Sequence, residues 1–197
     1  MVDAGFSLRQ TGENMQADIA IGLLETSSIA KGVETLDAMC KAAGIKLQTA
    51  HPISRGKYII IISGPVGEVE SSMNAGVQMA GETLISKFII RNVHKEVLKS
   101  LNAKVPAKDF EAVGIVETKE ALAVVFAADM AAKAAKVHLV EIKTGTGIGG
   151  KGYFTIVGEV GAVRSAINAA VQSLKGDMII SKIVIPQAHK HLSEAIF

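Results

Sequence analysis

Ala20-Ile-Gly-Leu-Leu-Glu-Thr26 returns later in the chain as Ala112-Val-Gly-Ile-Val-Glu-Thr118. Three more pairs follow in the same order: Asp37–Ala43 with Asp129–Ala135, Gly56–Gly64 with Gly150–Gly158, and Ser86–His94 with Ser181–His189. Residues at matching positions, called twins below, are 92 residues apart at first and 95 apart at the end. A repeat of this length is too long for a solenoid unit and matches two small fused domains. The sequence therefore predicts an internal duplication, and with it an ancestor that worked as a symmetric ring.

Both copies have the same predicted order of elements. The first copy has a strand (Asp18–Glu25), a helix with Ile29, Val33, Leu36 and Cys40 at helical spacing, two strands (Ile45–Ala50, Lys57–Ser63), a helix (Val66–Ala80), a strand (Ile85–Ile90) and a short helix near His94. The second copy repeats them with Glu111–Glu117, a helix around Asp129, Val137–Lys143, Gly152–Val157, Val160–Leu174, Ile179–Ile185 and a short helix near His189. This βαββαβ order predicts two tandem ferredoxin-like α+β domains, with helices on one face of an antiparallel sheet.

The domain boundaries follow from the repeat. We expect a flexible polar leader at residues 1–17, a first domain at 18–101, a linker at 102–110 and a second domain at 111–197. The linker is polar and contains Pro106. The leader lacks the basic start and long apolar core of a secretion signal.

Composition excludes several classes of function. The net charge of +2, the 4% aromatic content and the lack of Trp argue against a nucleic-acid partner. Cys40 is the single cysteine, so neither an internal disulfide nor a cysteine metal site within one chain is possible. Mean hydropathy is high, at +0.34, yet no apolar run approaches the ~18 residues of a membrane span. The longest apolar run is Ala121–Ala128, which Asp129 ends. We therefore expect no membrane partner, and we interpret the apolar excess of the chain as buried subunit contact.

Gly145-Thr-Gly-Ile-Gly-Gly-Lys151 matches both G-x-G-x-x-G and the start of a phosphate-binding loop. Both motifs require a helix directly afterwards, because the helix N-terminus holds the phosphate. Here Gly152–Val157 is rich in aromatic and β-branched residues, which favours a strand. The sequence thus favours a β-hairpin loop, where backbones from several subunits crowd together, over the alternative of a nucleotide-binding protein.

Three of the segments resemble bacterial microcompartment (BMC) shell domains: the motif Ala20–Thr26, the helix end Asp37–Gly44, and the strand and loop that lead to Gly56-Lys57. The likeness covers roughly residues 18–197, and two unpermuted copies resemble the tandem-domain, trimer-forming shell proteins, most of all the T-type of propanediol-utilisation compartments. The resemblance implies a structural protein of a microcompartment shell in the cytoplasm, not an enzyme. It also implies a flat homotrimeric pseudohexamer with a central metabolite pore, which contacts other shell proteins edge to edge and, in addition, encapsulated enzymes.

The resemblance also assigns residues. It places the pore at Ile53, Ser54, Arg55 and Gly56, with Thr146, Gly147, Ile148 and Gly149 in the second copy. The propanediol relative has Ile-Cys-Pro-Gly-Lys at the first loop, and its cysteine is associated with an iron–sulfur cluster. Ser54 replaces that cysteine, so we expect no cofactor and no metal, and an iron–sulfur electron-transfer protein is the second alternative. The contact between tiles falls on Lys41 and Lys133, whereas the edge arginine of the family is missing or displaced.

The remaining polar candidates have simpler explanations. No catalytic residue is expected, and we interpret the twins Glu25 and Glu117 as structural caps. His94 and His189 lie at predicted helix starts, where a hydrogen-bonding role is expected. His51 is the one histidine with a candidate transport or pH role, and Arg55 is the strongest functional candidate after Ser54.

Overall fold

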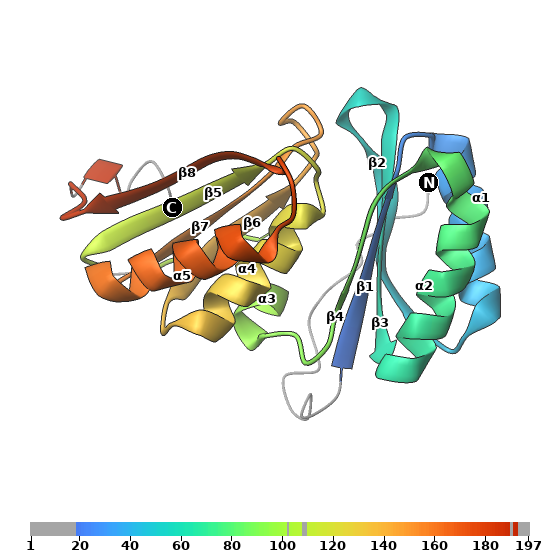
Figure 1. Ribbon diagram of the computed structural model, residues 1–197, viewed down its shortest axis with the longest axis horizontal. Coiled ribbons are helices and arrows are strands. Elements are labelled where there is room, and N and C mark those ends of the chain that lie inside the picture. The colour runs from blue at the N-terminus through green and yellow to red at the C-terminus, as the bar shows by residue number, and fades with distance from the viewer. Residues whose placement is uncertain (1–18, 102, 108–109, 190, 193–197) are drawn as a thin grey trace, which may run out of the picture.

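The computed structural model describes residues 19–101, 103–107, 110–189 and 191–192. The predicted leader and part of the last predicted helix lie outside these ranges. The described chain forms two α+β units side by side (Figure 1). Among the described residues, no helix combines the length and apolar character needed to cross a membrane.

The first unit has the predicted element order. It consists of β1 (Ile19–Thr26), α1 (Ile29–Ala42), β2 (Lys46–Ile53), β3 (Lys57–Pro65), α2 (Val66–Ala80), β4 (Leu84–Ile90) and α3 (Lys95–Ser100). Its antiparallel sheet has the order β2-β3-β1-β4. Ser28 starts α1 by accepting a hydrogen bond from the Lys31 amide, as an N-cap serine does.

The second unit repeats this arrangement. It consists of β5 (Ala112–Thr118), α4 (Ala123–Ala134), β6 (His138–Thr144), β7 (Gly152–Gly158), α5 (Val160–Ser173) and β8 (Ile179–Pro186), in a sheet of order β6-β7-β5-β8. The prediction of two α+β units with the βαββαβ order is thus confirmed.

The repeated motif explains why strand and helix pack closely in both units. A Cβ atom at Gly22 would lie 2.8 Å from Met73 Cγ, and one at its twin Gly114 would lie 2.8 Å from Val163 Cγ1. Glycine therefore leaves room for the side chain of Met73 on α2 to pack directly over β1, and for that of Val163 on α5 to pack over β5. Alternate residues of β1 and β3 divide between the two faces of the sheet: Leu24 and Ile60 pack under the helices, whereas Ile21 and Ile59 face the second unit.

The predicted apolar face of α1 is wrong in one respect. The helix forms, but the side it buries carries Gly32, Thr35 and Met39, because the Tyr58 ring packs directly over Gly32. Of the predicted stripe, Leu36 packs against this core, whereas Ile29 and Val33 are 43% and 52% exposed and Cys40 is exposed as well. The exposed residues therefore contribute little to the core of their own unit.

Helix α4 lies in the seam between the two units, against β4 of the first. Val125, Ala128 and Ala132 of α4, together with Ala121 just before the helix, are buried in one cluster. The cluster also contains Ile21, Leu23 and Ile61 of the first unit. Phe88 of β4 stacks on Phe126 of α4, with ring centroids 5.2 Å apart. The longest apolar run of the sequence, Ala121–Ala128, thus contributes to the core between the two halves of one chain.

Candidate functional site

The two hairpin loops with the predicted pore residues meet at one end of the seam (Figure 1). The first loop, Ser54–Gly56, joins β2 to β3, and the second, between β6 and β7, starts at Gly145. A Cβ atom at Gly145 would collide with the side chain of Ile53. One at Gly150 would lie 2.9 Å from the Ser54 carbonyl oxygen. The loops therefore touch through their backbones, and the second loop can contain no larger residue at these two positions.

Backbone angles define the shape of both loops. Arg55 has a φ of 69°, in the left-handed region that non-glycine residues rarely adopt, and Gly56 follows with a φ of 70°. The Arg55 side chain is exposed and Ser54 is half-buried. In the second loop Gly147 and Gly149 also have positive φ, and Thr146 is exposed, with Ile148 half-buried.

Strand β7 begins directly after the glycine loop, at Gly152. The expected β-hairpin is thus confirmed. A nucleotide cradle of the kind considered from the sequence needs a helix N-terminus at this point, and a strand end does not supply one.

A buried ion pair lies beneath the loops. Lys57 Nζ is 2.8 Å from Glu25 Oε1 and donates a second hydrogen bond to the Gly150 carbonyl, at 3.2 Å. Glu25 is fully buried, and its other carboxylate oxygen accepts hydrogen bonds from Ser86 Oγ and from the Leu122 amide, both at 3.3 Å. Leu122 is the N-cap residue of α4. Glu25 is thus the cap that the sequence predicts, although it caps a helix of the other unit.

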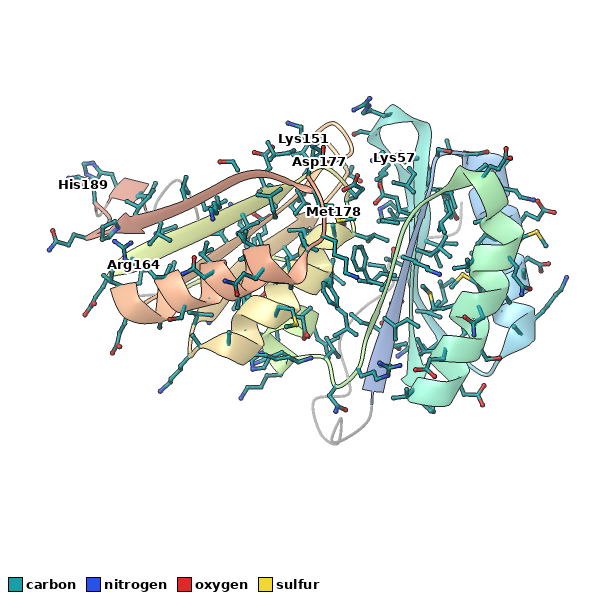
Figure 2. The ribbon with its side chains drawn as sticks, in the orientation of Figure 1. Lys57, Lys151, Arg164, Asp177, Met178 and His189 are labelled. Carbon is teal, nitrogen blue, oxygen red and sulfur yellow. The ribbon has the colours of Figure 1, made fainter. Side chains whose placement is uncertain are left out.

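The twin pair in the second unit is open to solvent. Lys151 Nζ lies 3.2 Å from Glu117 Oε1, and the two side chains are 46% and 35% exposed. Ser181, the twin of Ser86, is exposed as well. Figure 2 labels both lysines: Lys57 lies at the seam, and Lys151 belongs to the rim of the second unit. The same residue types thus occur once in a closed contact and once in an open one.

The predicted edge lysines also lie in different surroundings. Lys133 Nζ contacts Asp129 Oδ2 at 2.5 Å and donates to the Arg91 carbonyl across the seam at 3.1 Å. Asp129 is buried and accepts the His94 amide at 2.8 Å. Lys41 pairs with Asp37 at 2.6 Å on an exposed surface. The sequence shows these residues as equal twins because it does not reveal what covers each helix.

The histidines have structural contacts. The His94 ring accepts a hydrogen bond from the Glu96 amide and caps α3, as predicted. His51 Nδ1 lies 3.0 Å from Thr49 Oγ1, and burial lowers the pKa of His51 below its usual 6.5.

Sequence reasoning missed His138, which lies 3.1 Å from Glu96 Oε2 and 3.2 Å from the Val105 carbonyl. Its twin is Lys46, so the repeat gave no signal for this contact.

Comparison with protein families and known structures gives a consistent result. The model of the BMC domain matches residues 20–93 and again residues 112–188. The bacterial microcompartment shell protein PduT of Citrobacter freundii is 38% identical over 175 residues, which are 88% of this chain and 95% of that protein. The carboxysome shell protein CsoS1A of Hydrogenovibrio crunogenus is 33% identical over 82 residues, 40% of this chain and 85% of its own.

Two solved structures extend the comparison. A microcompartment protein from Desulfitobacterium hafniense is 45% identical, with a TM-score of 0.78 over 90% of this chain and 99% of its own. The fused permuted hexameric shell protein of the RMM microcompartment has a TM-score of 0.64 over 79% of this chain and 83% of its own. Its identity of 19% supports a shared fold alone.

Proposed function

The chain belongs to the BMC-domain family of microcompartment shell proteins, and from this premise we propose that three copies close into a pseudohexameric tile with a central pore for small metabolites. The relatives are structural shell proteins, and the chain is likewise a structural component of a bacterial microcompartment shell, in the cytoplasm, and not an enzyme. The trimer and its pore are our proposal for this chain.

The contrast between α1 and α4 carries the proposal. Ile29, Val33 and Cys40 are exposed, whereas their twins Ala121, Val125 and Ala132 are buried against the first unit. An apolar stripe that one repeat buries and the other leaves open matches a surface that a second copy covers. The seam within the chain serves as the template: α1 of the next copy takes the position on the second unit that α4 takes on the first.

The complementary surface lies on the sheet of the second unit. Ile183 of β8 is 42% exposed, whereas its twin Phe88 packs on α4. Ile115 is only partly buried, whereas its twin Leu23 is fully buried in the seam. Because each chain then offers one helix stripe and one sheet face, the contact is heterologous. Such a contact gives a closed ring when the rotation between neighbouring copies closes, as we propose for three copies.

The paired loops support a common axis for the pore. In a ring of three copies, three Ser54–Gly56 loops alternate with three glycine loops around one centre. Three Arg55 guanidinium groups then lie near one another and favour anionic metabolites, as rings of cationic side chains do in other pores. Lys41 and Lys133 remain our proposed contacts to neighbouring tiles, with other shell proteins and encapsulated enzymes as partners.

The residues at this axis do not fit an iron–sulfur cluster. Cluster irons are held by cysteine thiolates, and position 54 carries a serine hydroxyl. Cys40 lies on α1, outside both loops. We therefore derive no electron-transfer step for this chain.

Light scattering coupled to size exclusion tests the ring, and the expected result is a trimer at micromolar concentration. Thiol labelling gives a second measurement, because Cys40 is exposed in the single chain whereas its twin Ala132 is 8% exposed. We expect slow maleimide labelling of Cys40 in the trimer and fast labelling after dilution dissociates it. A monomer at micromolar concentration, or fast labelling in a trimer, contradicts the proposed contact.

A further inference from the structure

We infer that Glu117 and Lys151 form a lock between copies, in which Glu117 caps α1 of the next copy and Lys151 binds the carbonyl of Gly56 in that copy's loop. The inference rests on the proposed ring, because it needs a second copy placed as the seam predicts. It adds a role for two residues that the sequence marks only as a cap and as the end of a glycine motif.

The closed pair within the chain shows what the lock requires. Glu25 holds three donors from three elements: Lys57 of β3, Ser86 of β4 and the Leu122 amide at the start of α4. A carboxylate at this position meets an unpaired amide and the positive end of the helix dipole, and both stabilise its charge. Full burial of Glu25 is tolerated because its oxygens are paired in this way.

The residues of this contact recur as twins, the acceptor and two donors in the second unit and the helix amide in the first. Glu117, Lys151 and Ser181 are the twins of Glu25, Lys57 and Ser86. The twin of the Leu122 amide is the Ala30 amide, which belongs to the first turn of α1. Ser28 already caps the Lys31 amide, and the first four amides of a helix have no partner within the helix itself. The Ala30 amide is therefore the donor that Glu117 of the preceding copy fits.

The lysine connects this cap to the pore loop. Lys57 holds the Gly150 carbonyl of the second loop while it pairs with Glu25. Gly56 is the twin of Gly150, and it follows Arg55 directly. Lys151 of one copy thus holds the loop that carries Arg55 in the next copy, and it is a positioning residue for that loop.

Three variants test the lock, each measured by light scattering and sedimentation as the protein is diluted. Glu117→Gln keeps an acceptor but removes the negative charge, and it is expected to weaken each seam about fivefold, the effect of losing a charge–dipole interaction of about 1 kcal/mol. A trimer contains three such seams, so its association constant falls on the order of a hundredfold. Lys151→Met is expected to shift it in the same direction. Both side chains are partly exposed in the single chain, and circular dichroism verifies that each variant folds.

Matched controls come from the twin pair. Glu25→Gln removes the same negative charge within one chain, so it lowers the denaturation midpoint at every protein concentration without requiring a second copy. The double variant Glu117→Lys with Lys151→Glu restores the ion pair but places a cation at the start of the next copy's α1. A lock between copies predicts that this exchange does not rescue the trimer.

The outcomes separate the lock from the ring. If the wild-type protein is a monomer, both the ring and the lock are overturned. If it is a trimer and Glu117→Gln dissociates at the same concentration, the lock alone is overturned. If the exchanged pair restores the trimer, the lock is also overturned, because the two side chains then act only as an ion pair within one chain.

Discussion

Val33 gives the sharpest test of the ring, because the single chain does not need it and the ring does. Its side chain is 52% exposed, whereas its twin Val125 is fully buried in the seam. Burying a whole valine side chain contributes about 1.5–3 kcal/mol, so completing the burial of Val33 contributes roughly 1 kcal/mol per seam. Val33→Asp removes that contribution and places a carboxylate in an apolar contact, which costs several kcal/mol more.

The expected result is a folded monomer. A loss of about 4 kcal/mol weakens a seam roughly a thousandfold, so a micromolar trimer dissociates. The fold is retained because aspartate and valine have similar helix propensities at an exposed position. Light scattering measures the oligomer, and circular dichroism measures the helix content of the same samples.

Ser71→Asp is the matched control. Ser71 and its twin Ser165 are both exposed, on α2 and α5, so neither copy of the seam contains them. This variant is expected to stay trimeric. If Val33→Asp also remains a trimer down to the concentration at which the wild type dissociates, the seam within the chain is not the template for the contact between copies.

Three further predictions concern the loops and the open sheet face. Ser54→Cys is expected to bind iron and to gain a broad visible absorption after anaerobic reconstitution, and to remain a trimer. If the trimeric variant binds no more iron than wild type, Ser54 does not lie at the axis, and the pore is assigned to Thr146–Gly149 instead. Arg55→Glu is expected to reverse a preference for anions in assembled shells, and equal permeability of wild type and variant to both ion signs argues against an Arg55 ring. Burial and the hydrogen bond to Glu141 raise the pKa of Tyr153 to about 12, so the stabilising effect of the neutral phenol is complete below pH 10 and is lost as pH rises towards 12. Absorbance at 295 nm should show this late step, and Tyr153→Phe should lower its amplitude, with Tyr58 as the other tyrosine of the chain. An amplitude unchanged by the substitution contradicts the assignment.

The order of strands and helices could be predicted well because the sequence contains two copies of the same unit. Strand, helix and loop positions that are ambiguous in one copy agree with their twins, and the offset is nearly constant. The glycine loop illustrates the gain: its motif alone suggests phosphate, whereas the strand-like residues after it correctly indicated β7.

Sequence reasoning failed where an apolar helix face can pack either on its own sheet or on another surface. Ile29 and Val33 have the spacing of a core stripe, but a residue that packs on its own sheet and one that faces away from it look alike in sequence. Conversely, the run Ala121–Ala128 is part of the apolar excess that suggested subunit contact, and it is buried within the chain. Periodicity reports that a face is apolar, and it does not report which partner covers it.

Fusion of two copies explains why the twins have diverged. A seam within one chain forms at a high effective concentration, whereas a seam between copies depends on protein concentration. The seam within the chain accordingly tolerates small residues such as Ala121 and Ala132, and it contains the contact between His138 and Glu96. In the proposed ring the outer seam has larger side chains at the twin positions, Ile29 and Cys40, and Lys46 replaces His138. In the proposed ring, the seam within the chain is therefore permanent, whereas the seam between copies depends on assembly. On this proposal, Glu25 is buried in the single chain and Glu117 becomes buried only when a second copy binds.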